Sequence, residues 1–439
     1  MATKRSTFRA SPELNNRNVA PRRAVRIIAT LVALAACFLG ALNSWREGHA
    51  QLLASYGAAT HQLEAVDRAA QLSPTTPEVH YVRASLLFDA GELTEATKEY
   101  EQAVALRPHD YALWLELGRA RDQANDTEGA LTALRESVRL APFYAQPHWQ
   151  LGNALYRTGR LDEAFVELRS ALISNPKLQP PVLELAWAAF RDDAQAVERV
   201  INPQSASMHL ALARLFVKHG KMNDAVAQFR LAGSVPDEER RSLLKEMLAA
   251  KHFTEAYEVW SGSRPKKEGQ APSDIALVLN GGFEEPISLD DPGFGWQLPR
   301  ALKAVQPSQD VAEPREGLQS LQLVWNGNAE MTLPTVSQLI LVGPHIRYQL
   351  RFAARTQEII TAGRPQIIVT DANSNNELVL AEPVTLPQGT SVWKDYMIEF
   401  ETGETTSAVS ISVRRQSCDS YPCPIFGRIW LDDFSMRKV

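Results

Sequence analysis

Residues 77–178 carry a hydrophobic pattern that recurs three times without a change of register. With Pro77, Tyr111 and Ala145 each taken as position 1 of a 34-residue unit, position 20 is always alanine and position 32 always proline. Apolar residues between them recur at helical spacing, which predicts two amphipathic helices per unit with one inward stripe each. The alanine lets the two helices approach closely, and the proline ends the second. The pattern predicts a solenoid of helical hairpins.

Four further columns support this register. Position 15, where the chain must turn, is Gly91, Asn125 and Gly159. Positions 7 and 8 are Leu117-Gly118 and Leu151-Gly152, and position 24 is Tyr100, Leu134 and Leu168. These columns resemble the tetratricopeptide repeat family. The resemblance continues more weakly through residues 43–76, 206–233 and 237–260; between residues 180 and 203 the second helix looks truncated, so we expect a kink or irregular turn there.

The resemblance implies a protein-binding groove on the concave face made by the first helices, where this family holds extended peptides or helices. The residues at the groove positions are Tyr81, Phe88, Leu115, Arg119, Trp149, Asn153, Tyr156 and Arg157. We expect an aromatic groove with few charges; alternatively, the aromatic side chains pack against the neighbouring repeat. The family's carboxylate clamp of lysines and asparagines is not reproduced, which disfavours binding of a chaperone's acidic tail.

The N-terminal region combines a basic tail with an apolar run. The first 26 residues hold seven lysines and arginines against one acid, and residues 27–42 carry no charge. We expect a basic cytoplasmic tail over residues 1–24 and a transmembrane anchor over residues 25–45, since a spanning helix needs ~20 residues and tilt absorbs a small mismatch. The expected location is a bacterial inner membrane, single-pass, with the remainder periplasmic. A cleaved signal peptide and lipidation of Cys37 are alternatives.

Helical periodicity ends at a polar linker, residues 261–273, and short alternating runs follow. These runs predict an antiparallel β-sandwich, a jelly roll, over residues 274–439, after a helical repeat region over residues 46–260. The predicted strands are residues 275–279, 318–325, 346–354, 366–370, 378–386, 396–400, 409–413 and 428–434. The fold class is therefore multidomain α plus β: a transmembrane helix, an α-helical solenoid and a β-sandwich.

Four motifs of this domain occur in a fixed order. They are Asn-Gly-Gly-Phe-Glu from residue 280, Gly-Phe-Gly-Trp from residue 293, Tyr-x-Leu-x-Phe-x-Ala-Arg from residue 348, and Asp432-Asp433. Together they resemble the galactose-binding-like jelly rolls that include many carbohydrate-binding modules. The resemblance implies candidate glycan-binding residues Trp296, Trp325, Arg347, Trp393 and Trp430, although most of these tryptophans can instead be core residues. It also implies a structural calcium at Glu284 with Asp432 or Asp433, which alternatively cap turns. No other cofactor is expected.

Cys418 and Cys423 enclose a short turn-forming segment with a proline, which favours a disulfide over two free thiols. A disulfide agrees with a location outside the cytoplasm.

Charge and motifs restrict the function. The whole chain is −5 and the first 26 residues are +6, so the remainder carries −11, which disfavours nucleic-acid binding. Phosphate loops, metalloprotease and hydrolase motifs are absent from the sequence, and the adjacent Glu284 and Glu285 point to opposite faces of a strand, so we expect no enzyme.

Three hypotheses follow. The preferred one is a membrane-anchored adaptor whose repeats bind a protein partner and whose β-sandwich binds glycan or another subunit, an architecture that resembles accessory proteins of bacterial exopolysaccharide and cell-envelope assembly. The second is a protein-only envelope scaffold, and the third is a glycan-cleaving enzyme.

Overall fold

A computed structural model describes residues 19–262, 278–287, 292–298, 305–327, 334–418 and 422–439. Its contacts divide the chain into two compact units, Met1–Val182 and Leu183–Val439. The predicted basic tail up to residue 18 and the linker from residue 263 lie outside the described residues.

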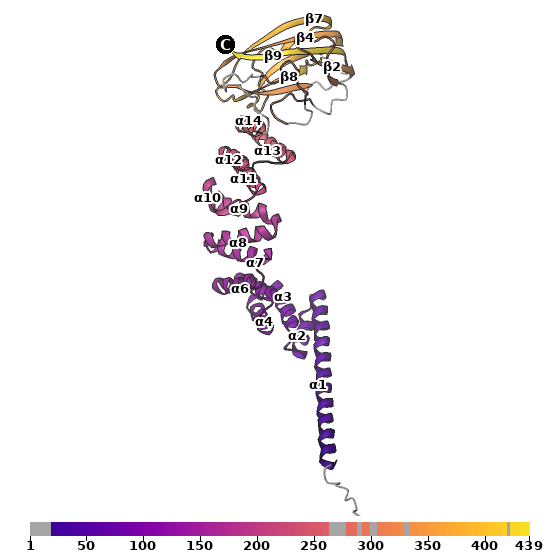
Figure 1. Cartoon of the computed structure of the whole chain (residues 1–439), viewed down its shortest axis with the longest axis vertical. Coiled ribbons are helices and arrows are strands. Elements are labelled where there is room, and N and C mark those ends of the chain that lie inside the picture. The colour runs from indigo at the N-terminus through magenta and orange to yellow at the C-terminus, as the bar shows by residue number, and fades with distance from the viewer. Residues whose placement is uncertain (1–18, 263–277, 288–291, 299–304, 328–333, 419–421) are drawn as a thin grey trace, which may run out of the picture. The chain divides into compact units, whose positions relative to one another are not determined.

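The first unit is a series of helical hairpins preceded by one long helix, as Figure 1 shows. The helices are α1 (Val19–Thr60), α2 (Leu63–Leu72), α3 (Pro77–Asp89), α4 (Leu93–Leu106), α5 (Tyr111–Gln123), α6 (Thr127–Leu140), α7 (Ala145–Arg157), α8 (Leu161–Ser174) and the short 3₁₀ helix η1 (Pro176–Leu178). Helix α9 (Gln179–Ala189) contains the boundary between the units.

The predicted 34-residue register is confirmed. Helices α3, α5 and α7 each begin at position 1 and have 13 residues, whereas α4, α6 and α8 each begin at position 17 and have 14. The turn residues at position 15 have left-handed backbones, with φ of 83° at Gly91, 63° at Asn125 and 74° at Gly159. Glycine and asparagine tolerate this conformation best, so the turn column follows from local backbone sterics.

The two helices of a hairpin interlock at positions 8 and 24. A Cβ atom on Gly118 would lie 2.6 Å from Leu134 Cγ, and one on Gly152 would lie 2.8 Å from Leu168 Cγ. The leucine of the second helix therefore fills the space that a side chain on the first would need, and this close approach explains the small residue.

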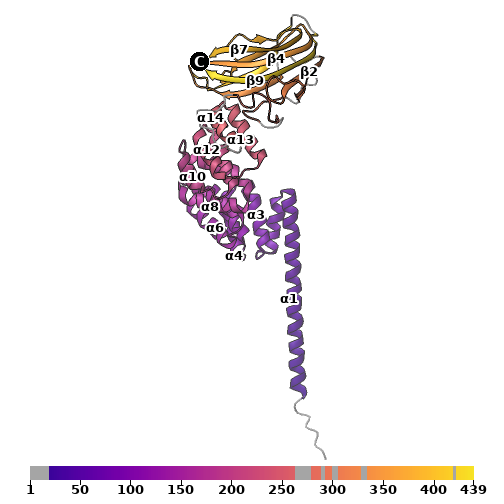
Figure 2. The same cartoon turned by 45° about the horizontal axis from the view of Figure 1, so that its top comes forward.

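Helix α1 runs unbroken from the apolar segment into the first hairpin. Ala50 and Ala54 pack with Val66, Ala69 and Val79 of α2 and α3, whereas the 18-residue apolar window near the start of the helix is not buried at all. Figure 2 shows this part of α1 extending beyond α2 and α3. Within the described residues, α1 is the one helix long and apolar enough to cross a membrane. The expected boundary at residue 45 lies inside this helix.

The helices of the second unit are α10 (Ala194–Ile201), α11 (Ala206–Lys218), α12 (Met222–Ala232), α13 (Asp237–Ala249) and α14 (Phe253–Ser261). Helix α10 has only eight residues, which confirms the expected truncation. Asp193 caps its start by accepting a hydrogen bond from the Ala196 N–H at 2.8 Å, and the left-handed Asn202 ends it.

The second unit also contains a sandwich of two antiparallel sheets. Their strand orders are β1-β2-β9-β4-β7 and β3-β8-β5-β6. The strands are β1 (Val305–Asp310), β2 (Ser320–Gly327), β3 (Val336–Leu341), β4 (Arg347–Thr361), β5 (Pro365–Asp371), β6 (Val384–Thr385), β7 (Gly389–Glu401), β8 (Ala408–Arg415) and β9 (Ile425–Lys438). One core cluster takes side chains from both sheets, including Leu323, Phe352 and Ile411. Strands β1 and β3 were not predicted, and the run at 378–386 contains only the two-residue β6.

Candidate binding sites

The predicted protein-binding groove is built on α3, α5 and α7. Tyr81 is 38% exposed, and its ring meets Tyr100 edge-on at 6.1 Å between centroids. Burial, and to a lesser extent the carboxylate of Glu116, raises the pKa of Tyr81 above its ordinary value, so its hydroxyl stays a hydrogen-bond donor. The first repeat thus presents a neutral aromatic surface beside α5.

Two arginines connect neighbouring helices along this surface. The Arg119 guanidinium lies 5.8 Å from the Phe88 ring centroid and donates to Glu116 Oε2 at 2.7 Å. Arg157 at the end of α7 forms an ion pair with Asp122 of α5. Each arginine is therefore matched by a carboxylate of α5, which leaves the groove close to neutral.

The third repeat contributes Trp149, Asn153 and Tyr156, all half-buried. Asn153 donates its Nδ2 hydrogen to the Trp149 carbonyl at 2.7 Å, and the Tyr156 ring stands edge-on to Phe165 at 6.4 Å. One groove prediction is wrong: Leu115 is only 3% exposed and belongs to the core cluster between repeats, because its side chain points into the hairpin.

A buried polar network in the same helices was missed. His80 Nδ1 lies 2.7 Å from Glu99 Oε2, its Nε2 lies 2.8 Å from the Pro74 carbonyl, and Arg83 Nη1 donates to Glu99 Oε1 at 2.5 Å. A ring nitrogen at position 4 contacts the carbonyl of the preceding proline in all three repeats: His80 with Pro74, Trp114 with Pro108 and His148 with Pro142. Recurrence of these ring nitrogens in one sequence column was the available signal.

Two predicted glycan-binding residues are core residues of the sandwich. Trp296 is 4% exposed and donates its indole N–H to the Asn280 carbonyl at 3.0 Å, and Trp325 is 2% exposed. A ring buried between two sheets cannot stack on a sugar, so both predictions are wrong. Strand alternation places Trp325 with Leu321 and Leu323 on the inner face of β2.

The other two tryptophans lie on the outer face of the five-stranded sheet. Arg355 of β4 is stacked against them, with its guanidinium carbon 4.0 Å from the Trp430 ring centroid and 5.5 Å from that of Trp393. Trp430 is only 4% exposed and donates to Asp310 Oδ2 at 2.6 Å, whereas Trp393 is half-buried. The hydrogen bond from Trp430 lowers the pKa of Asp310, which stays an acceptor. Trp430 is therefore a third predicted glycan-binding tryptophan whose ring is buried, and Trp393 is the predicted tryptophan that stays partly accessible.

A row of side chains crosses the same face. Ser308 of β1 is paired with Gln322 of β2, Gln322 with Trp430 of β9, and Trp430 with Arg355 of β4. Arg347 is not part of this row: it lies eight residues earlier on β4, ~26 Å away at strand spacing, and contacts Glu401 at 3.5 Å.

The β1–β2 loop, residues 311–319, is tied to Arg355 and Trp393 on this face. Glu313 forms an ion pair with Arg355, and the Glu313 carbonyl accepts the Trp393 indole N–H at 3.2 Å. The buried Asp432 accepts hydrogen bonds from the backbone N–H groups of Arg315 and Glu316 at 2.8 and 3.3 Å. Burial raises the pKa of Asp432, although the hydrogen bonds from Arg315 and Glu316 act to lower it.

The three candidate calcium ligands do not form a cluster. Glu284 accepts the Leu318 N–H at 2.9 Å, Asp432 holds the same loop, and Asp433 is exposed. Among the described residues, no group of three or more histidine, cysteine, aspartate or glutamate side chains could hold a metal ion. Calcium takes six to eight oxygens. The two carboxylates fit a loop-holding role better, and structural calcium stays a prediction.

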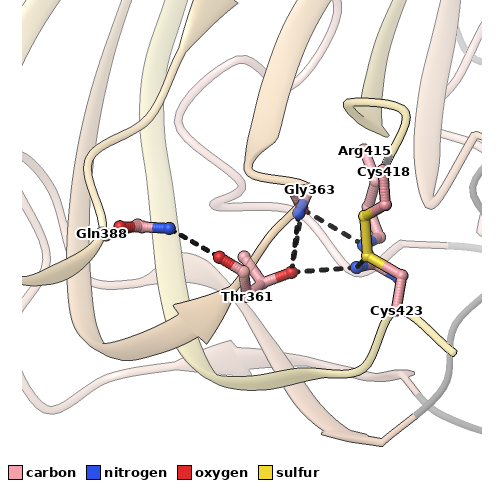
Figure 3. The surroundings of a disulfide bond; sticks show 6 residues. All are labelled: Thr361, Gly363, Gln388, Arg415, Cys418 and Cys423. Atoms are coloured by element: carbon pink, nitrogen blue, oxygen red, sulfur yellow. Dashed lines mark hydrogen bonds between the residues drawn. A yellow bond between two sulfur atoms is a disulfide. The ribbon is translucent and has the colours of Figure 1, made fainter. Parts of the chain in front are cut away.

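The structure joins Cys418 and Cys423 in a disulfide beside the buried Arg415 (Figure 3). Arg415 Nη2 lies 3.1 Å from Cys423 Sγ and donates to Thr361 Oγ1 at 2.9 Å. Burial lowers the pKa of Arg415. Thr361 Oγ1 also accepts the Gly363 N–H at 3.1 Å, so the disulfide loop is held against the turn between β4 and β5.

A family model described as "Tetratricopeptide repeat" matches residues 55–111, 81–145 and 115–178. These overlapping matches cover the same helices that repeat in the structure. The repeats indicate a protein-interaction scaffold.

The curated relatives match less than a third of this chain. The BBSome complex member bbs-4 of Caenorhabditis elegans is 29% identical over 28% of this chain and 29% of its own length. The peroxisomal targeting signal receptor of Candida albicans is 31% identical over 24% of this chain and 18% of its own length. The chain thus spans less than a third of either relative.

Two solved structures each match less than half of the chain. "Crystal structure of YrrB: a TPR protein with an unusual peptide-binding site" covers 39% of this chain and 89% of that one, with a TM-score of 0.31 and 18% identity. "CBM4 structure and function" covers 37% of this chain and 99% of that one, with a TM-score of 0.29 and 14% identity. These TM-scores are low, so the fold assignment rests on the helices and strands of the chain itself.

Proposed function

From the tetratricopeptide repeats we infer that this chain is a non-enzymatic, membrane-anchored scaffold. Its repeats bind a protein partner, its β-sandwich binds a glycan or a second subunit, and its setting is bacterial exopolysaccharide or cell-envelope assembly. The observation that carries the proposal is the partly accessible aromatic surface of α3 and α7, formed by Tyr81, Trp149 and Tyr156.

This surface suits a peptide or helix with apolar anchors. The half-buried Trp149 and Tyr156 and the partly exposed Tyr81 offer large contact area at a low entropy cost. Arg119 and Arg157 already have carboxylate partners, so an acidic ligand must displace Glu116 or Asp122 to reach them. The partner segment is therefore recognised mainly through its apolar side chains.

The proposed anchor is the first part of α1. Its unburied 18-residue apolar window spans ~27 Å as a helix, close to the ~30 Å of a bilayer core. The arginine-rich tail favours a cytoplasmic N-terminus, and a disulfide agrees with a periplasmic location for the remainder. The residues after Cys37 continue the same helix into the first hairpin. This continuity favours an uncleaved anchor over a cleaved signal peptide.

The outer face of the five-stranded sheet is the proposed glycan site. Trp393 provides an accessible ring, and Ser308 and Gln322 in the same face provide hydroxyl and amide groups for hydrogen bonds to sugar hydroxyls. The alternative is a protein-only scaffold. It gains support from the burial of Trp296, Trp325 and Trp430, which removes three of the four predicted stacking residues.

Two measurements on the full-length protein test these proposals. Capture of envelope proteins from detergent extracts should fall for the double variant Trp149→Ala/Tyr156→Ala and stay unchanged for Phe143→Ala, whose ring is 87% exposed in the turn before α7. On a glycan array, binding should be lost in Trp393→Ala and kept in Val392→Ala, a neighbour that is 77% exposed. Glycan binding that survives Trp393→Ala, or no binding at all, rejects the glycan site; equal capture by both groove variants rejects the groove.

A further inference from the structure

Helix α1 carries an apolar stripe that continues beyond its proposed membrane segment. We define the α1 seam by residues spaced alternately four and three apart: Phe38, Leu42, Trp45, His49, Leu52 and Tyr56. Trp45, Leu52 and Tyr56 are 64%, 71% and 53% exposed, although this part of α1 belongs to the first hairpin and lies after the uncharged run of residues 27–42. Leu52 and Tyr56 lie beyond the proposed membrane segment, where large exposed apolar side chains on one face mark a contact site.

The chain's own repeats occupy the other side of this helix. Ala50 and Ala54 are buried against α2 and α3, and a Cβ atom on Gly57 would lie 2.4 Å from Val66 Cγ2. The seam residues lie on the face turned away from these contacts. The first hairpin therefore leaves the seam open while fixing α1 in place.

The spacing of the seam indicates what covers it. A helix packed on a globular surface follows the natural period of 3.6 residues, whereas a strict heptad of alternating three- and four-residue steps has a period of 3.5 and matches another helix in a left-handed coiled coil. The same steps continue upstream at Ala35, Leu31 and Ile28, so the heptad runs from residue 28 to residue 56. The partner must be a long helix that also crosses from the apolar segment into water.

We propose that the partner is a second copy of this chain, paired through α1 in parallel and in register. Every copy carries the same seam at the same distance from the apolar segment and with the same direction, so two copies match residue by residue. The seam contains no aspartate, glutamate, lysine or arginine, so like positions meet without charge repulsion. His49 is the one polar residue among the six, and a single polar seam position favours one register. The parallel orientation rests on the proposed membrane anchoring.

The area available is adequate for a stable contact. Aromatic side chains bury roughly 150–250 Å² each. Phe38, Trp45 and Tyr56 are all more than half exposed, and Leu42 and Leu52 add to them. The seam therefore offers several hundred Å² per copy, on the order of the ~800 Å² per partner of a standard interface. Pairing would give a scaffold with two grooves and two β-sandwiches on one anchor.

Cysteine cross-linking of the full-length protein in its native membranes tests the proposal. In a Cys37→Ser background, Leu52→Cys places a thiol in the seam, and the neighbouring Gln51→Cys places one outside it on an equally exposed position. A short bis-maleimide should give about tenfold more covalent dimer with Leu52→Cys, because seam positions of paired helices face each other. Similar yields from both variants, no dimer from either, or an adduct with a different protein overturns the proposal.

A second pair of variants tests dimer formation without chemical cross-linking. Leu52→Glu should convert a detergent-solubilised dimer to a monomer in size-exclusion chromatography with light scattering, whereas Gln51→Glu should leave the dimer intact. A monomeric wild-type protein overturns the pairing. Membrane fractionation of the same samples reports separately on the anchor, because a dimer found in the soluble fraction rejects the anchoring but retains the pairing. Circular dichroism checks that all four variants keep their helices.

Discussion

Replacing Glu99 by glutamine should destabilise the hairpin of α3 and α4 through its buried ion network. The Glu99 carboxylate contacts His80 Nδ1 at 2.7 Å and Arg83 Nη1 at 2.5 Å, and the His80 and Glu99 side chains are only 6% and 9% exposed. Removing one member of a buried pair costs roughly 3–5 kcal/mol, because the other charge remains without compensation. Glutamine keeps the shape and one acceptor, so we expect a loss of about 2–3 kcal/mol in the free energy of unfolding.

The stability difference between the wild type and Glu99→Gln should depend on pH, because two members of the network titrate. The hydrogen bond to Glu99 raises the pKa of His80 above its ordinary value, against the effect of burial. Burial by itself raises the pKa of Glu99, but the His80 hydrogen bond and the Arg83 charge outweigh it and lower the pKa. The His80 contribution is therefore complete below about pH 6.5 and is lost as the pH rises through its raised pKa, while the Glu99 contribution is present above about pH 4.5 and is lost as the pH falls through its lowered pKa.

Urea unfolding followed by far-ultraviolet circular dichroism measures this window. At about pH 6 the wild type should exceed Glu99→Gln by the full difference, and towards about pH 9 the difference should shrink as the pH rises through the raised pKa of His80. Glu95→Gln is the matched control on α4, since Glu95 is 53% exposed and lies 3.9 Å from Lys98, and its effect should stay below about 0.5 kcal/mol. An equal loss at both pH values, or none, would refute the assigned role of the network.

Three more predictions concern packing, the β1–β2 loop and calcium. Leu168→Ala should cost about 3–5 kcal/mol in urea unfolding because Leu168 is 0% exposed, whereas Ile173→Ala on the same helix, at 84% exposure, should cost less than about 0.5 kcal/mol. Arg355→Ala should release the loop and red-shift the fluorescence of Trp430; an unchanged spectrum would show that the loop stays in place without the arginine. A calcium chelator should leave the Tm within about 1 °C, because backbone N–H groups already occupy the two loop-holding carboxylates; a clear fall would establish a calcium site.

The helical repeats were predictable because their determinants are local. A left-handed turn at Gly91, an alanine at the close approach of two helices and a proline after the second helix each act within one 34-residue unit. The groove positions followed from the same register, and all except Leu115 are at least partly accessible. The network of His80 and Glu99 escaped because its partners lie 19 residues apart on different helices, where spacing along the chain gives no sign of contact.

The sandwich was predicted as a fold but not as a site. Alternation along a strand separates two faces without saying which one is covered, so Trp325 and Trp393 looked equivalent although one is core and the other accessible. The strand β1 was missed because it contains a proline and mostly exposed residues.

The sequence alone determined the order of apolar segment, 34-residue repeats and β-sandwich, because helix periodicity, turn residues and strand alternation are written within short windows. Tertiary structure decided which aromatic rings are accessible, that the β1–β2 loop contacts Arg355 and Asp432, and that α1 continues from the apolar segment into the first hairpin with one face free. These features depend on contacts between segments that lie far apart in the chain. Whether a residue is buried follows from that packing and cannot be read from its neighbours in the sequence.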